Sequence, residues 1–169
     1  MDQMHQTHQF EPVYDENSLV LILGTFPSVK SRENRFFYGH PQNRFWKVLA
    51  ELTGEEVPLT IPDKKQLLLS HHIAVWDVVY SCDITGSSDS SIRNVVSCDL
   101  TPVLQESRIR AIFANGSTAA KLYEKYQRKQ TGMEIIPLPS TSPANASCSL
   151  DKLKKAWSVI ADYLQQDEE

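Results

Sequence analysis

The residues best suited to chemistry lie between positions 24 and 47, where cations alternate with aromatic rings. The cations of this stretch, opposed only by Glu33, are Lys30, Arg32, Arg35, Arg44 and Lys47. Its rings are Phe26, Phe36, Phe37, Tyr38, Phe45 and Trp46. Cations suit a phosphate backbone and flat rings suit a stacked base, so the stretch predicts contact with nucleic acid.

Two polar side chains in the same stretch could act on a bound molecule. Asn43 carries one acceptor and two donors, which can orient a water or bind the edge of a base. His40 can donate a hydrogen bond to an anion or to a departing group. The alternatives are local: Asn43 as an ordinary polar residue at a helix start, and His40 as a cap.

These residues follow a predicted strand. The apolar run 19–23 is short and β-rich, which predicts a buried strand, and Gly24-Thr25-Phe26-Pro27-Ser28 ends it. In α/β folds, a loop at the carboxyl end of a buried strand is a usual place for a ligand site.

The remaining pattern alternates strands with helices. Further strands are expected at 73–76, 109–114 and 133–136. Helices are expected at about 42–52, 62–72, 99–106 and 117–126, and from Ser149 or Asp151 to about Tyr163. This order implies right-handed crossovers and a parallel sheet. We expect a single three-layer α/β/α domain over residues 1–169, with a central four-stranded, mostly parallel sheet and a polar N-terminal tail to about residue 15.

Two further loops have unusual composition. Residues 138–145, Leu-Pro-Ser-Thr-Ser-Pro-Ala-Asn, follow the last predicted strand and should face the loop at Gly24 across one cleft. Residues 81–93 are polar and rich in small side chains, which is typical of functional or mobile loops.

Composition narrows the class of protein. The chain has 169 residues, 41% of them hydrophobic, and a net charge of −4. No apolar run approaches the roughly 20 residues needed to span a bilayer, and the polar N-terminus does not resemble a secretory signal, so we expect a cytoplasmic protein. The three scattered cysteines and the adjacent His71 and His72 match no metal-ligand spacing, so no metal or cofactor is expected.

The amino-acid sequences of the two facing loops resemble those of the uracil-DNA glycosylase superfamily. The string His40-Pro41-Gln42-Asn43-Arg44-Phe45-Trp46 is similar to one in mismatch-specific uracil/thymine glycosylases. With Tyr38-Gly39 before it and residues 75–78 midway, the resemblance is closest to hypoxanthine-DNA glycosylases and spans residues 18–165. Mismatch-type enzymes carry a water-activating Asn two residues after the Gly of the first loop. Phe26 stands there in this chain, which fits the hypoxanthine type, whose catalytic residue is attributed to the Asn of the His-Pro-x-Asn string.

The resemblance implies roles for individual residues. Asn43 takes the catalytic role, assisted by His40. The implied base-binding residues are Gly24, Thr25, Phe26, Pro27, Tyr38 and Asp77, although Asp77 could instead be a structural cap. The implied DNA-binding residues are Ser28, Lys30, Arg35, Arg44, Ser140, Ser142, Pro143 and Asn145.

The resemblance therefore implies a base-excision repair enzyme that flips a deaminated base, most simply hypoxanthine, out of double-stranded DNA and hydrolyses its glycosidic bond. We expect a monomer, with single-stranded DNA as a further possible substrate. The alternatives are a mismatch-type uracil/thymine glycosylase, a non-catalytic lesion-binding protein of the same fold, and a hydrolase of free nucleosides. The last would not need the cationic stretch.

Overall fold

The computed structural model describes residues 3–165, and a four-stranded sheet runs through its centre. Its strands are β2 (Val20–Gly24), β3 (Ile73–Asp77), β6 (Ala111–Asn115) and β7 (Ile135–Leu138). They lie in the order β3-β2-β6-β7 and every neighbouring pair is parallel. The first three are buried along their whole length. The predicted parallel sheet is confirmed.

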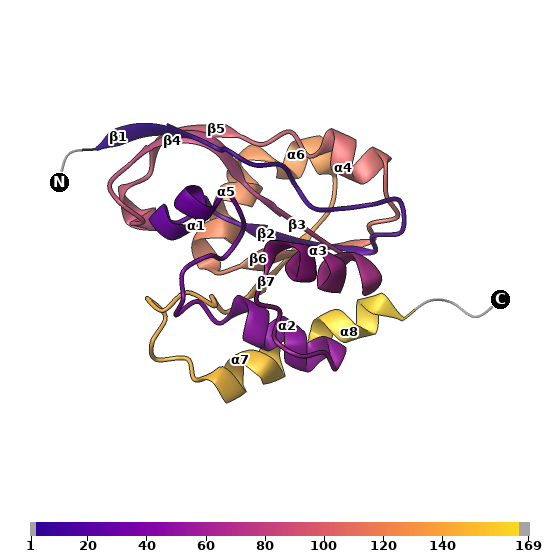
Figure 1. The fold of residues 1–169 in the computed structure, drawn as a ribbon. Coiled ribbons are helices and arrows are strands. Elements are labelled where there is room, and N and C mark those ends of the chain that lie inside the picture. Colours follow the sequence, from indigo (N-terminus) through magenta and orange to yellow (C-terminus); the bar gives the residue numbers. More distant parts are fainter. Residues whose placement is uncertain (1–2, 166–169) are drawn as a thin grey trace.

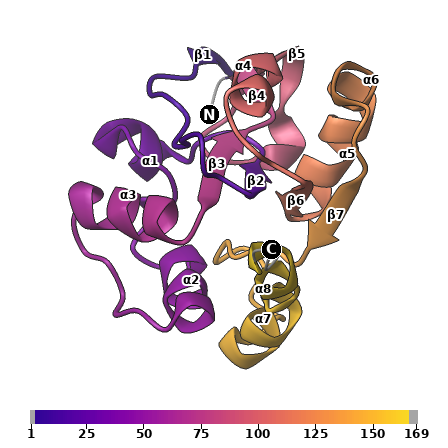
Figure 2. The same cartoon turned by 90° about the vertical axis from the view of Figure 1, so that its right-hand side faces the viewer.

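Helices pack around this sheet. They are α1 (Val29–Asn34), α2 (Phe45–Thr53), α3 (Ile61–Ser70), α4 (Thr101–Gln105), α5 (Ser117–Tyr126), α6 (Arg128–Thr131), α7 (Leu150–Trp157) and α8 (Val159–Leu164). Figure 2 shows α2, α7 and α8 together on one side of the sheet. α3 contacts β3, and α5 contacts β6 and β7. The predicted C-terminal helix is divided at Ser158 into α7 and α8.

A second, smaller sheet lies on the other side of the central one (Figures 1 and 2). It consists of β1 (Met4–Thr7), β4 (Val79–Ile84) and β5 (Arg93–Ser97), antiparallel in the order β1-β4-β5. The sequence did not predict this sheet. The loop expected at 81–93 is shorter in the structure, because its first residues belong to β4 and its last residue begins β5. The connection between the two strands contains a 3-10 turn, η1 (Asp89–Ser91).

Residues 4–13, which fall within the polar tail expected from composition, pair with both sheets. β1 pairs with β4, and the Val13 backbone exchanges hydrogen bonds of 3.0 and 2.9 Å with Val75. Because β1 is an edge strand held by backbone bonds, its mostly exposed side chains show no apolar alternation from which it could be recognised. Among the described residues, no helix is long and apolar enough to cross a membrane.

Candidate active site

A cavity of about 330 Å³ lies where the parallel strands end. Gly24, Asp77 and Asn115 are the last residues of β2, β3 and β6, and the loop after β7 supplies the facing wall. The lining residues that the sequence predicted as site residues are Gly24, Thr25, Phe26, Pro27, Ser28, Tyr38, His40, Asn43, Asp77, Ser140, Ser142 and Pro143. Two distant loops thus meet in one cavity, as the order of the strands predicted.

Other lining residues were not predicted. They are Ser31, Phe37, Ser87, Asp89, Asn115 and Thr141. Asn115 could be recognised from the sequence only as a residue at a helix start. Asp89 lies in the polar loop whose composition is typical of functional loops, which is the only signal that could have drawn attention to it.

Asn43 is held by its side-chain oxygen. Its Oδ1 accepts one hydrogen bond from the Phe45 backbone N–H at 3.0 Å and another from the Thr141 hydroxyl at 2.8 Å. A carbonyl oxygen has two lone pairs, so both are used. The Nδ2 amide donates no hydrogen bond within the described residues. Asn43 therefore serves the helix start and also offers the cavity a side chain that can only donate.

Thr141 is held in turn by Asn115. The Asn115 Nδ2 donates to the Thr141 hydroxyl at 3.0 Å, and the Thr141 backbone N–H donates to Asn115 Oδ1 at 3.0 Å. Thr141 is fully buried and Asn115 is 9% exposed. Buried hydrogen bonds of this kind fix side chains in one arrangement. The chain Asn115–Thr141–Asn43 therefore locks the amide of Asn43 in place.

Arg44, which the sequence predicted to bind DNA, bonds other parts of the protein in this structure. Its guanidinium donates to the backbone oxygens of Ser142 at 3.0 Å and Asn145 at 3.1 Å, and also to that of Cys148. The half-buried side chain is therefore occupied in holding the loop after β7 against α2. A cation in sequence can satisfy backbone carbonyls as well as a phosphate, and composition cannot distinguish the two.

The floor of the cavity is formed by Gly24, Asp77 and Tyr38. Gly24 and Asp77 are register partners in neighbouring strands. A Cβ at Gly24 would lie 2.5 Å from Asp77 Oδ1 and 2.8 Å from the Tyr38 hydroxyl, so only glycine fits. Burial raises the pKa of Tyr38, and the Asp77 carboxylate adds to the rise. The phenol therefore stays protonated and can donate.

Asp77 makes one side-chain hydrogen bond within the described residues, between its Oδ2 and His8 Nε2 at 2.7 Å. Its side chain is 5% exposed. The sequence left open whether Asp77 binds the base or acts as a structural cap. One carboxylate oxygen is held by His8, and Oδ1 lies beside Gly24 and the Tyr38 hydroxyl on the floor of the cavity, so the base-binding role of Asp77 stays a prediction.

Aromatic rings line the same region. Phe26 is 8% exposed, and the Arg32 guanidinium lies 5.6 Å from its ring centre. Tyr38 stacks on Phe45 with ring centres 3.9 Å apart. His40 Nδ1 accepts a hydrogen bond from the Gln42 backbone N–H at 3.1 Å, so its Nε2 carries the proton of the neutral ring. His40 is therefore a local cap that still has a donor.

Asp89 brings a second carboxyl to the cavity from η1. Unlike Asp77, the residue is exposed. Desolvation by the neighbouring walls raises the pKa of Asp89 to about 6; a hydrogen bond from Thr25 opposes the rise and the Asp77 carboxylate adds to it. The charge of this group therefore changes just below neutral pH.

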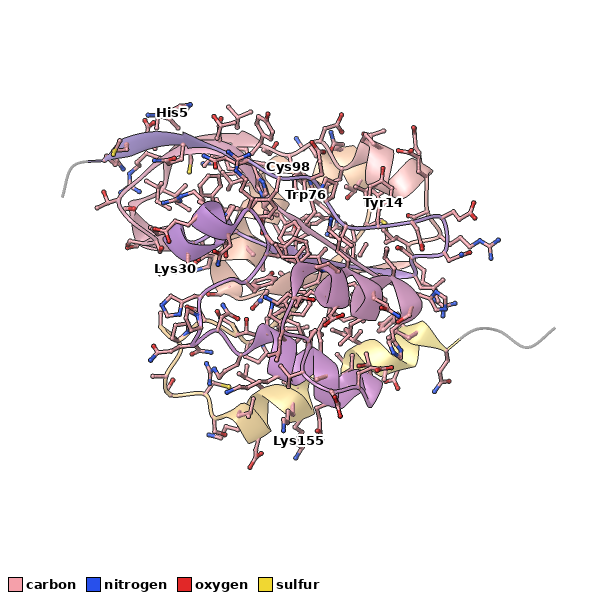
Figure 3. The ribbon with its side chains drawn as sticks, in the orientation of Figure 1. His5, Tyr14, Lys30, Trp76, Cys98 and Lys155 are labelled. Atoms are coloured by element: carbon pink, nitrogen blue, oxygen red, sulfur yellow. The ribbon has the colours of Figure 1, made fainter. Side chains whose placement is uncertain are left out.

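The other predicted DNA-binding residues lie near the cavity mouth or outside it. Lys30 is exposed on α1 (Figure 3) and forms a 3.3 Å ion pair with Glu33. Arg35 is exposed at the end of α1 and makes no ion pair in the described part of the chain. Asn145 donates to the Ser140 backbone oxygen at 3.0 Å, which shapes the loop. It lines an adjoining cavity of about 820 Å³.

The described residues contain no group of three or more metal-ligating side chains. The side chains that line the cavity carry amide, hydroxyl, carboxyl, imidazole and aromatic groups.

Comparison with known proteins agrees with this geometry. Residues 11–162 match the model of the uracil DNA glycosylase superfamily. The chain belongs to this superfamily. The membership expected from the two facing loops is confirmed.

Relatives within the superfamily are similar over most of the chain. A hypoxanthine DNA glycosylase of Methanosarcina acetivorans is 34% identical over 153 residues, which cover 89% of this chain and 95% of the relative. A hypoxanthine DNA glycosylase of Methanosarcina barkeri is 31% identical over 155 residues, covering 88% and 93%. The solution NMR structure of a candidate uracil DNA glycosylase from M. acetivorans has a TM-score of 0.81 and 31% identity, covering 96% of this chain and 100% of that one.

Proposed function

We propose that this protein is a DNA glycosylase that removes hypoxanthine from double-stranded DNA. The observation that carries the proposal is the cavity at the ends of β2, β3 and β6, closed below by Asp77 and Tyr38 and bordered by the locked amide of Asn43. Its volume of about 330 Å³ lies within the range of small-molecule sites. The names of the M. acetivorans and M. barkeri relatives support the same substrate.

Base flipping brings the target into this cavity. A glycosylase cannot reach the glycosidic carbon inside the stack, so the nucleotide rotates out of the helix. The base then lies deep in the cavity and the sugar nearer its mouth. Phe26 offers a stacking face worth about 1–3 kcal/mol per base. The Asp77 carboxylate accepts from a ring N–H, which hypoxanthine has at N1 and adenine lacks.

Asn43 stabilises the departing base. As the C1′–N bond lengthens, electrons flow onto the base and the sugar becomes cationic. Since Asn43 Oδ1 is already used by Phe45 and Thr141, only Nδ2 is available, and it donates to the base as negative charge develops. A fixed donor at a developing anion stabilises the transition state more than the ground state.

The attacking water needs an acceptor. Asn43 has none free, and Asp77 lies on the floor where the base binds. Asp89 lines the cavity from η1 and, unlike Asp77, is an exposed residue that water can reach. We assign it the role of orienting the water through its ionised form. In this hydrolysis the oxygen of the water bonds to C1′ as the C1′–N bond breaks. The base leaves with the electron pair of that bond and takes up the proton that the water loses.

Outside the cavity, fewer cations are available for contact with DNA than the sequence suggested. Lys30, whose ion pair with Glu33 is exposed, and Arg35 are placed to approach phosphates, with Ser28, Ser140, Ser142 and Pro143 lining the cavity. One chain supplies the whole cavity, so we propose that a monomer acts.

A direct assay tests the proposal. Duplex oligonucleotides containing hypoxanthine, uracil or thymine opposite guanine are incubated with the protein, and abasic sites are cleaved with alkali. We expect strand breaks at hypoxanthine above all. Breaks at uracil or mismatched thymine without breaks at hypoxanthine would support the mismatch-type alternative. Tight binding with no breaks would support a lesion-binding protein, and a matched single-stranded set measures strand preference.

A further inference from the structure

The N-terminal segment reaches the floor of the cavity through a buried contact. His8 Nε2 lies 2.7 Å from Asp77 Oδ2, and the two side chains are 0% and 5% exposed. The residues are 69 positions apart in sequence. His8 also precedes residue 11, where the match to the superfamily model begins. The contact is therefore not explained by the part of the chain that defines the superfamily.

The backbone fixes the position of His8. β1 pairs antiparallel with β4, ending with Thr7 opposite Ser81. The next N–H, that of His8, donates to the Tyr80 backbone oxygen at 2.7 Å. Because β4 begins at Val79, only Val78 separates it from Asp77. Pairing of β1 with β4 thus delivers the imidazole of His8 to the carboxyl of Asp77.

The contact determines which Asp77 oxygen is free. His8 takes Oδ2, and Oδ1 stays beside Gly24 and the Tyr38 hydroxyl on the cavity floor. No other side chain in the described residues donates to Asp77. Without His8 the buried carboxyl would lack a side-chain partner among the described residues. No side-chain hydrogen bond would then hold Oδ1 toward the cavity.

The surroundings of His8 assign its tautomer. Its Nδ1 is buried and has no partner among the described residues. The ring is enclosed by Phe10, Phe26, Phe37 and Trp76, with centres 4.3 to 6.0 Å away. A neutral ring protonated on Nε2 leaves only a lone pair unsatisfied, whereas an imidazolium would leave a buried N–H without an acceptor. His8 Nε2 therefore carries a proton and donates it in a hydrogen bond to Asp77 Oδ2.

We propose that His8 is a positioning residue for base recognition: it holds the Asp77 carboxylate so that Oδ1 accepts the ring N–H of the flipped base. The N-terminal strand β1 is then part of the specificity machinery. The inference rests on the proposed function, since it requires a base bound at Asp77.

The same strand provides a matched control. His5 also faces an aspartate, with Nδ1 3.1 Å from Asp83 Oδ1, but these side chains are 65% and 27% exposed. Figure 3 shows His5 projecting outward from β1, whereas Trp76, which contacts His8, lies inside. Substituting His5 tests the effect of changing a His–Asp pair on β1 without touching the cavity.

The experiment compares His8→Leu, His8→Gln and His5→Leu. Single-turnover excision of hypoxanthine is measured against enzyme concentration, which separates half-saturation from maximal rate. Affinity for a duplex with a tetrahydrofuran abasic site is measured alongside. We expect His8→Leu to raise half-saturation about tenfold or more, because a site left with an unpositioned polar group loses discrimination, while abasic affinity stays unchanged. His8→Gln, which retains a donor, should recover most of the loss, and His5→Leu should match wild type.

Several outcomes would overturn the inference. One is wild-type half-saturation in His8→Leu; another is equal weakening for the hypoxanthine and abasic duplexes, which would indicate a purely structural role. A third is His8→Gln behaving like His8→Leu. If His8→Leu does not fold, His8→Asn, whose amide is too short to reach Asp77, takes its place with the same expectation. Wild-type protein that releases no hypoxanthine would refute the proposed function instead. In that case the affinities of wild type and His8→Leu for the hypoxanthine duplex, measured beside those for the abasic duplex, decide the role of His8.

Discussion

Two walls of the cavity differ in how firmly they are held. On one side Asn43 is fixed through fully buried Thr141 and Asn115, and Arg44 holds the loop behind them. On the other side Asp89 stands in a short 3-10 turn and is exposed. The locked wall supplies a donor and the exposed wall supplies an acceptor. The difference suits a hydrolysis in which the base must be held in one place while water must be able to enter.

The largest expected effect is on the locked wall. Asn43→Ala should slow single-turnover excision of hypoxanthine by about 10²–10³, or roughly 2.7–4 kcal/mol, the scale for one preorganised donor. Affinity for the duplex should change little, because the interaction strengthens only as the bond breaks. Wild-type single-turnover excision in this variant would make Asn43 structural.

The exposed wall predicts a dependence on pH. Because the pKa of Asp89 is raised to about 6, its ionised form predominates above that pH. The single-turnover rate should rise with pH to about 6 and level off by about 7. Asp89→Asn should be about 10²-fold slower and should no longer show this dependence on pH. A rate that falls as pH rises through 6 would instead make Asp89 a proton donor.

Thermal stability separates the role of Asp89 from a structural one. A carboxyl whose pKa is higher in the folded protein than in the unfolded chain stabilises the fold below the unfolded pKa, and this contribution is lost as pH rises through about 6. A neutral Asn carries no such loss. At pH 8, Asp89→Asn should therefore melt at or above the wild-type temperature. A clear drop in Tm would contradict this assignment.

Arg44 tests how far the locked wall depends on its loop. Arg44→Ala removes several charge-assisted hydrogen bonds to backbone oxygens, so it should cost about 1–3 kcal/mol and lower Tm by about 3–10 °C. Lys30→Ala is the matched control: its exposed ion pair is worth little, and its Tm should stay near wild type. Equal Tm values for the two variants would contradict the inference that Arg44 holds the loop after β7 against α2.

The smallest expected effect concerns salt. With Arg44 occupied, only Lys30 and Arg35 of the predicted cations are left to meet phosphates. The logarithm of the binding constant should fall with the logarithm of salt concentration at a slope of about −2, or −0.9 per contact. Arg35→Ala should reduce the slope by about one. A slope near zero would argue against contact with the DNA backbone.

The sequence predicted the elements whose signal is local. The buried run before Gly24, the Ser149 helix cap and the loop after β7 are each recognisable within a few residues, and together they predict the cavity. The resemblance added the candidate roles of Asn43 and Asp77. These roles stay predictions until variants are measured.

The parts that the sequence did not predict depend on partners far along the chain. Thr141 meets Asn43 from 98 residues away, and His8 meets Asp77 from 69 residues away. No periodicity or spacing encodes such pairs. β1 was missed because an edge strand needs only backbone partners. The bonds of Arg44 to backbone oxygens were missed because a positive charge does not reveal which oxygens it meets.

The central claim is that Asn43 acts by donating a hydrogen bond from Nδ2, and single-turnover release of hypoxanthine by Asn43→Asp tests it most directly. This variant keeps both side-chain oxygens, so Phe45 and Thr141 retain their acceptor, but it has no amide N–H to offer the base. We predict that Asn43→Asp is as slow as Asn43→Ala, within about threefold, because the missing donor is what stabilises the transition state. A rate for Asn43→Asp close to that of the wild type would contradict the account and return the side chain to a role as acceptor for water.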